Sequence, residues 1–192
     1  MLYGSVLGDL ILESDGSALT GLRFGCSVDA WMDGEGPFTT ELQQKKDAGP
    51  DAGKNKGKDA SAACGKEMEK PLEIFEETRL WLDCYFEGRD PGAIPPIRLD
   101  TNATPFRKEV WKILLSIPYG KTLTYSEIAA RIAKARGIRK MSAQAVGGAV
   151  SQNPIAIIVP CHRVIGADGK LTGYAGGLAR KAWLLDLEQS AE

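Results

Sequence analysis

The chain has few of the residues that build metal sites or disulfides, and it has no long apolar run. It contains one histidine, His162, and four cysteines without a CxxC pair, so we expect no structural zinc site. No stretch approaches the roughly 20 apolar residues of a membrane-spanning helix. The N-terminal MLYGSVLGDL has no basic region and includes an aspartate, unlike a secretory signal. These absences predict a cytoplasmic, intracellular protein with reduced cysteines.

Charge is divided unevenly along the 192 residues, although the net charge is only −1. Residues 1–97 carry 10 Lys and Arg against 18 Asp and Glu, whereas residues 98–192 carry 14 against 7. An excess of positive charge in one half favours contact with a polyanion. The alternative is an uneven surface charge that serves no partner.

The first half contains strand patterns, a low-complexity stretch and a helix pattern. Residues 2–13 and 18–25 predict two strands joined at the turn signal Asp15-Gly16. Residues 44–70 are rich in Lys, Gly, Ala and Asp without apolar periodicity, and predict a mobile surface insertion. An amphipathic helix is expected over 71–87, with Leu72 and Leu80 among its apolar residues. The Pro- and Gly-rich residues 88–100 then indicate a boundary between two domains, 1–97 and 98–192.

Helix signals punctuate the second half. Thr104 before Pro105 is a typical N-cap, Thr124 opens a capping box, and Ser142 precedes a short helix expected over 143–150. The last two helices are consistent with a helix-turn-helix. The short helix, AQAVGGAV, contains two glycines that each cost about 1 kcal/mol relative to alanine. Close approach to another surface would explain them, either a DNA groove or a neighbouring helix.

The residues best suited to chemistry surround Cys161. An apolar run at 155–159 predicts a buried strand, and Pro160 then precedes Cys161, His162 and Arg163. Neighbouring positive charge is expected to lower the pKa of the thiol and favour the nucleophilic thiolate. Because successive residues of a strand point to opposite faces, His162 reaches Cys161 only if the chain bends or a water intervenes. The alternative is an inert buried cysteine followed by a surface His-Arg pair.

These segments resemble a known family. The sequence IIVPCHRV at 157–164, with Asn153-Pro154 before it and GYAGG at 173–177 after it, is similar to the active-site signature of O6-alkylguanine-DNA alkyltransferases, also called methylated-DNA–protein-cysteine methyltransferases. FRKEVWKIL, IPYGKTLTYSEIA, AQAVGGAVSQNPI and KAWLLDLE follow the family order, so the resemblance covers residues 98–192, whereas residues 1–97 match loosely. It implies an α/β plus α fold class, with a small ribonuclease-H-like α/β domain before a winged-helix (helix-turn-helix) domain.

The resemblance implies direct, stoichiometric and irreversible DNA repair, in which Cys161 accepts the alkyl group of O6-alkylguanine. O4-alkylthymine is a second candidate substrate. His162 would take the thiol proton through a bridging water while Glu188 holds the imidazole. Asn153 would brace the backbone of the helix-turn-helix and the active-site loop. Tyr125 would press the target phosphate and donate a proton to the leaving guanine.

The same resemblance makes residues 142–150 a recognition helix that lies in the minor groove and flips the damaged base. Gln144 stands where many members have an arginine that fills the vacated space, so we expect the same role with weaker DNA affinity. The expected DNA contacts are Ala143, Gln144, Ala145, Gly147, Gly148, Ser151 and Tyr125. The expected walls of the base pocket are Tyr174, Ala175, Gly176 and Val164. Arg163 is expected to form a structural ion pair, and Lys181 to add positive field near the thiol.

The product of this reaction would be a thioether, which water has no easy route to cleave, so a single turnover without cofactor or metal is expected. We expect a monomer whose partner is double-stranded DNA carrying O6-alkylguanine. We expect it to bind no membrane and to need no protein partner. Three other kinds of protein are alternatives: a relative that binds lesions but has no acceptor cysteine, a DNA-binding regulator and a cysteine hydrolase. The first lacks the acceptor cysteine, whereas Cys161 is present here. The second would have no use for Cys161, His162 and Glu188 together, and the third would turn over.

Overall fold

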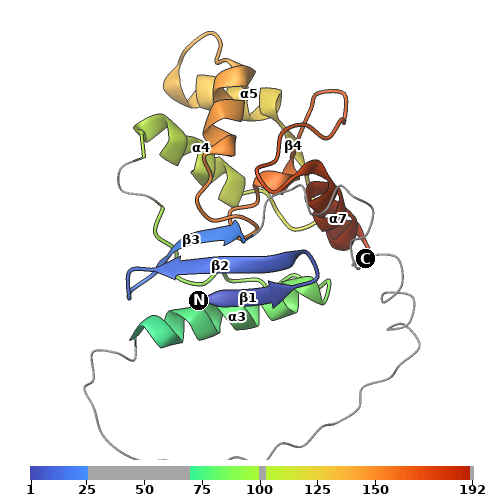
Figure 1. Cartoon of the computed structure of the whole chain (residues 1–192). Coiled ribbons are helices and arrows are strands. Elements are labelled where there is room, and N and C mark those ends of the chain that lie inside the picture. The colour runs from blue at the N-terminus through green and yellow to red at the C-terminus, as the bar shows by residue number, and fades with distance from the viewer. Residues whose placement is uncertain (26–69, 100–102, 191–192) are drawn as a thin grey trace, which may run out of the picture.

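The computed structural model describes residues 1–25, 70–99 and 103–190 (Figure 1). Its first part is an antiparallel sheet with one helix against it, and its second part is mainly helical, which confirms the expected mixed α/β content. The insertion expected at 44–70 lies outside the described residues apart from Lys70. No helix within the described ranges is both long and apolar enough to cross a membrane.

Three strands form the sheet in the order β1-β2-β3, namely β1 (Leu2–Ser5), β2 (Gly8–Ser14) and β3 (Leu19–Phe24). The prediction of one strand over 2–13 was wrong, because the chain reverses between Ser5 and Gly8. The Ser5 hydroxyl donates to the Gly8 carbonyl and accepts from the Leu7 amide. Gly8 has a φ of 93°, a conformation that glycine adopts without steric cost. Side-chain hydrogen bonding therefore makes a hairpin that the apolar pattern concealed.

Helix α3 (Lys70–Phe86) lies along one face of the sheet, as Figure 1 shows. The predicted helix is confirmed, but its buried face differs from the expected one. Leu72 and Leu80 are 65% and 59% exposed, whereas Ile74, Leu82 and Tyr85 are buried. A hydroxyl-bearing aromatic residue is therefore in the core, and its partners lie at the candidate site described below.

Helices α4 (Pro105–Leu115), α5 (Tyr125–Arg136) and α6 (Ala143–Ser151) begin where the capping signals predicted. The Thr104 hydroxyl accepts from the Arg107 amide, and the Ser142 hydroxyl accepts from the Ala145 amide. Thr124 and Glu127 form the complete capping box at α5. Helix α7 (Leu178–Gln189) is the last helix of the described residues, and β4 (Leu123–Thr124) pairs in parallel with β5 (Val164–Ile165).

Residues 155–159 do not form the predicted strand. Ile155 makes an isolated parallel bridge to Leu22 of β3, and the backbone then turns, with a φ of 67° at Ile157. The backbone of this run is irregular, yet the side chains of Ile155, Ile157 and Val159 are fully buried. Their burial explains why the run is apolar. The Leu22 amide donates to Pro154 O at 2.9 Å, and its carbonyl accepts from the Ala156 amide at 2.8 Å. The edge of the sheet therefore supports the loop that leads to Cys161.

Candidate active site

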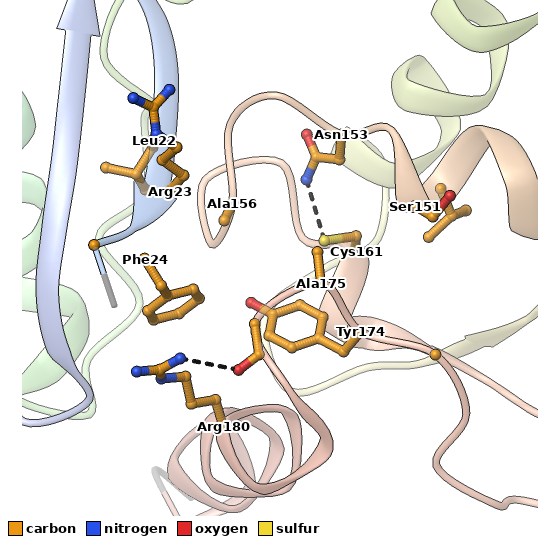
Figure 2. A pocket seen from close by; sticks show the side chains of 14 residues that line it. Leu22, Arg23, Phe24, Ser151, Asn153, Ala156, Cys161, Tyr174, Ala175 and Arg180 are labelled. Carbon is orange, nitrogen blue, oxygen red and sulfur yellow. Dashed lines mark hydrogen bonds between the residues drawn. The ribbon is translucent and has the colours of Figure 1, made fainter. Parts of the chain in front are cut away.

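Cys161 begins a single 3₁₀ turn, η2 (Cys161–Arg163), directly after Pro160. The chain thus bends at the thiol instead of continuing as a strand, which was one of the two ways for His162 to act on Cys161. The thiol is nearly buried and lines a cavity of about 320 Å³ (Figure 2). The cavity gives the nearly buried sulfur access to a small ligand.

Three segments that are distant in the sequence line this cavity. Strand β3 and its end contribute Leu22, Arg23, Phe24 and Gly25. The end of α6 and the following loop contribute Val150, Ser151, Asn153 and Ala156. The loop before α7 and its first turns contribute Gly173, Tyr174, Ala175, Gly176 and Arg180. The wall from β3 was not anticipated, because nothing in the local sequence shows which loop a strand edge will face.

Of the four residues expected around a base pocket, Tyr174, Ala175 and Gly176 line the cavity. Val164 does not, since it lies buried in β5 and its carbonyl accepts a hydrogen bond from Lys181 Nζ at 2.6 Å. Phe24 packs edge-on against the Tyr174 ring, with 6.3 Å between the ring centroids. The Tyr174 hydroxyl is buried without a hydrogen-bond partner in the described part of the chain. The cavity therefore has an aromatic wall that carries a polar atom of its own.

Asn153 connects the backbone around the site to the thiol. Its Nδ2 donates to Val159 O at 2.8 Å. The same nitrogen approaches the Cys161 sulfur, Sγ, at 3.1 Å, as Figure 2 shows. Its Oδ1 accepts from the Ile155 amide at 3.1 Å. The backbone contacts agree with the expected bracing of the active-site loop, whereas the contact with the sulfur was not foreseen. A donor on the sulfur stabilises the thiolate relative to the thiol.

His162, the residue after Cys161, forms a fully buried pair with Glu188. Imidazole Nε2 lies 2.7 Å from Oε1 of Glu188, and imidazole Nδ1 is buried without a partner among the described residues. The carboxylate is an acceptor, so the imidazole carries its proton on Nε2 and has its lone pair on Nδ1. Nδ1 is therefore the nitrogen that can accept a proton.

Three further groups donate to the carboxylate of Glu188. Arg163 donates from Nε at 2.9 Å and from Nη2 at 3.0 Å, which is the structural ion pair expected of it. The Gly120 amide donates at 3.1 Å, and the Tyr85 hydroxyl donates to Oε1 at 2.6 Å. The role of Tyr85 was missed. Its position beside Leu82 on an amphipathic helix indicates burial, but no sequence signal identifies a partner 103 residues away.

The protonation states follow from burial and from these contacts. Burial raises the pKa of the Cys161 thiol, despite the lowering effects of Asn153 and of the Lys181 ammonium. The expected lowering of the thiol pKa was therefore wrong in its net direction. Burial lowers the pKa of His162 in spite of Glu188. Burial alone would raise the pKa of Glu188, but hydrogen bonds and charge from His162 and Arg163 hold it at about 2. At neutral pH the site holds a thiol, a neutral imidazole and a carboxylate.

Apart from Gln144, the exposed and half-buried residues of helix α6 have very small side chains. Gln144, Ala145, Gly148 and Ser151 are exposed, and Ala143 and Gly147 are half-buried. A methyl group built on Gly148 would meet nothing within 4 Å, and one on Gly147 would make ordinary contact with the Tyr125 ring at 3.8 Å. Packing within the described chain therefore does not require a glycine at 148.

Tyr125 starts α5 between α6 and the loop before α7. Its hydroxyl donates to Thr172 O at 3.2 Å. Lys181, which extends from α7, also donates to Thr172 O, at 2.8 Å. Burial raises the pKa of Tyr125, so its hydroxyl keeps its proton at neutral pH. No group of three or more His, Cys, Asp or Glu within the described ranges is arranged to hold a metal ion.

Comparison with known proteins gives the family. Residues 105–190 match the family described as 6-O-methylguanine DNA methyltransferase, DNA binding domain. A methylated-DNA–protein-cysteine methyltransferase of Methanosarcina barkeri is 51% identical over 118 residues, which are 62% of this chain and 70% of that protein. The protein of the same name from Haemophilus influenzae is 34% identical over 187 residues, 97% of this chain and 84% of its own length.

A solved structure agrees with these matches. The crystal structure of Mycobacterium tuberculosis OGT in complex with DNA superposes with a TM-score of 0.65 and 37% identity, and covers 99% of this chain and 92% of that one. The likeness thus extends over the amino-terminal part as well as the part that carries Cys161. This chain belongs to the methylated-DNA–protein-cysteine methyltransferase family.

Proposed function

We propose that this protein repairs DNA by moving the alkyl group of O6-alkylguanine onto the sulfur of Cys161, once and without turnover. The observation that carries the proposal is the site itself. A nearly buried thiol lines a cavity of about 320 Å³ and contacts Asn153. The next residue is a buried histidine whose Nδ1 has no hydrogen-bond partner within the described ranges. Glu188 holds the other nitrogen of that imidazole.

Proton removal comes first in the mechanism. Since the thiol pKa is raised, the sulfur has to lose its proton when the substrate is in place. His162 Nδ1 takes that proton through one bridging water, and Glu188 stabilises the imidazolium that results. The Asn153 amide and the Lys181 ammonium stabilise the thiolate. The bend of the chain at Cys161 and an Nδ1 without a hydrogen-bond partner among the described residues thus support His162 as a general base that acts through one water molecule.

Displacement at carbon completes the reaction. The thiolate attacks the alkyl carbon, a sulfur–carbon bond forms, and the bond from that carbon to guanine O6 breaks. Guanine leaves with the electron pair and receives a proton from the Tyr125 hydroxyl, whose raised pKa keeps it protonated until then. The product on Cys161 is a thioether, which water does not readily cleave. The steps balance without a cofactor, and the protein is consumed.

The target base has to leave the double helix, because O6 lies inside the stack. Extrusion costs a few kcal/mol, and a pocket that receives the base offsets part of this cost. We propose that Tyr174, Ala175 and Gly176 wall that pocket, as their place around the cavity supports. O4-alkylthymine is a second candidate substrate, since it presents an alkylated oxygen in a comparable position.

We propose that α6 lies in the minor groove and that Gln144 occupies the space left by the extruded base. The open surroundings of Gly148 support this, because the alternative explanation, tight packing against a neighbouring helix, does not apply there. Exposed Arg139 and Lys140 precede the helix and suit phosphate contacts. Binding should therefore weaken steeply as salt is raised. We further propose that the protein acts as a monomer of two domains, 1–97 ribonuclease-H-like and 98–192 winged-helix.

Mass spectrometry tests the proposal directly. After incubation with duplex DNA that contains O6-methylguanine, one methyl group per protein should appear on the peptide that carries Cys161. Cys161→Ser should abolish transfer while DNA binding persists. Cys84→Ser, which alters a half-buried thiol of α3, is the matched control and should transfer normally. Repeated turnover would indicate a hydrolase, and the absence of any adduct would indicate a protein that only binds DNA; either result would overturn the proposal.

A further inference from the structure

Tyr85, which belongs to the amino-terminal half of the chain, contacts the buried pair of His162 and Glu188. The residue is fully buried in α3, against the sheet. Its hydroxyl donates to Glu188 Oε1 at 2.6 Å and lies 3.3 Å from His162 Nε2. Its ring packs edge-on to the imidazole, with 6.4 Å between centroids. The hydroxyl thus lies at the junction of the carboxylate and the imidazole.

We propose that Tyr85 is a positioning residue for alkyl transfer, and that its hydroxyl fixes the Glu188 oxygen that holds the His162 proton on Nε2. This inference rests on the function proposed above. Tyr85 does not touch the sulfur or the cavity, so it acts through Glu188 and His162. It also makes the geometry of the site depend on the docking of α3.

The distribution of donors on the carboxylate explains why this contact matters. Oε2 is held by Arg163 Nε and by the Gly120 amide. Oε1 accepts from His162 Nε2 at 2.7 Å and from Arg163 Nη2 at 3.0 Å. The bond from the Tyr85 hydroxyl, at 2.6 Å, is the shortest of the three contacts on Oε1. Without it, Oε1 can move relative to the imidazole, and the proton on Nε2 is held less firmly.

Removal of the hydroxyl also changes the charge balance around the imidazole. Charged and titratable groups act on the imidazole from three elements: the Tyr85 hydroxyl from α3, Arg163 from η2, and Lys181 and Glu188 from α7. Burial lowers the pKa of His162, and Glu188 acts in the opposite direction. A phenol that donates to Glu188 disperses part of the carboxylate charge. Without that phenol, Glu188 attracts the imidazolium more strongly, so the pKa of His162 should rise.

Tyr85→Phe tests the inference, and Tyr119→Phe is its matched control. Tyr119 packs edge-on to Tyr85 at 5.9 Å between centroids, and its buried hydroxyl has no partner among the described residues. The single-turnover rate of methyl transfer should fall about tenfold in Tyr85→Phe, a part of the roughly 10² to 10⁴ that a general base contributes. The acid limb of the rate against pH should move to higher pH. Tyr119→Phe should keep both the rate and the pH profile.

The outcomes separate this inference from the proposed function. If the unsubstituted protein and Tyr119→Phe form the Cys161 adduct while Tyr85→Phe matches them at every pH, Tyr85 has no positioning role. If the unsubstituted protein forms no adduct, the proposed function itself is wrong. A uniform rate loss with an unmoved pH profile would indicate a structural effect and would overturn the inference.

Nuclear magnetic resonance gives a readout that does not depend on activity. The chain contains a single histidine, so imidazole nitrogen shifts in a protein without a histidine tag report His162 alone. The unsubstituted protein should show the Nε2-protonated tautomer, and Tyr85→Phe should titrate at higher pH. Should that variant not fold, the buried Tyr85 hydroxyl proton of the unsubstituted protein should exchange slowly and show proximity to the imidazole. An Nδ1-protonated tautomer or a freely exchanging hydroxyl would refute the inference.

Discussion

Glu188→Gln isolates what the buried carboxylate contributes to the fold. Glu188 accepts from Tyr85, His162, Arg163 and Gly120, through bonds of 2.6 to 3.1 Å. Glutamine keeps the shape but offers one acceptor oxygen, and its amino group faces groups that are themselves donors. The Arg163 guanidinium then remains nearly buried without a counter-ion. The substitution therefore breaks a buried ion pair while leaving the packing in place.

The magnitude can be worked from the carboxyl pKa, which is lowered from 4.5 to about 2. At about 1.4 kcal/mol per pKa unit, the contacts of Glu188 with its donors favour the folded state by about 3 kcal/mol at neutral pH. Removal of one partner of a buried ion pair typically costs about 3–5 kcal/mol. The two routes agree, so Glu188→Gln should lower the free energy of unfolding by about 3–5 kcal/mol at neutral pH.

The pH dependence has a definite sign. A carboxyl whose folded pKa is lowered stabilises the protein above its unfolded pKa of 4.5, and this stabilisation is lost as the pH falls from 4.5 towards 2. Glutamine does not titrate, so the difference between the two proteins should narrow across that window. Urea unfolding at neutral pH and at decreasing pH measures both effects.

Glu109→Gln provides the matched control, because Glu109 pairs with Arg136 in a partly exposed ion pair. Its loss should cost about 0–1 kcal/mol, as for surface ion pairs in general. If the two variants have the same free energy of unfolding, the buried contacts of Glu188 do not stabilise the protein by the predicted amount. A difference that stays constant down to low pH would contradict the pKa argument.

Further variants probe the pocket and the DNA face. Gly176→Ala would place a methyl group 2.6 Å from the Phe24 ring and 2.7 Å from the Tyr174 ring, so the pocket wall must shift. The free energy of unfolding, measured in urea, should fall by roughly 1–3 kcal/mol, and methyl transfer should slow. An unchanged rate would mean that this wall of the cavity does not contact the target base. Gly148→Ala should stabilise helix α6 by up to about 1 kcal/mol yet weaken DNA binding in fluorescence anisotropy. Gln144→Ala should lower both repair rate and DNA affinity, and unchanged values would mean that the assignment of Gln144 is wrong.

The sequence alone was enough to predict those features that depend on contacts between residues close together in the chain. The caps at Thr104, Thr124 and Ser142 were placed correctly, because a capping side chain bonds an amide two or three residues away. The segment around Cys161 identified the family, because its chemistry is concentrated in adjacent residues. The early turn between Ser5 and Gly8 was missed, since the apolar pattern runs through it.

Tertiary structure decided what depends on contacts between distant residues. The apolar run at 155–159 predicted a strand, but burial of irregular backbone gives the same composition, and only the packing against Leu22 distinguishes them. The thiol pKa depends on how deeply Cys161 is buried, which its charged neighbours did not show. Tyr85 meets Glu188 across 103 residues because the docking of α3 brings its hydroxyl to the carboxylate. A sequence records which groups are available, whereas the desolvation and partners that set their reactivity exist only once the chain has folded.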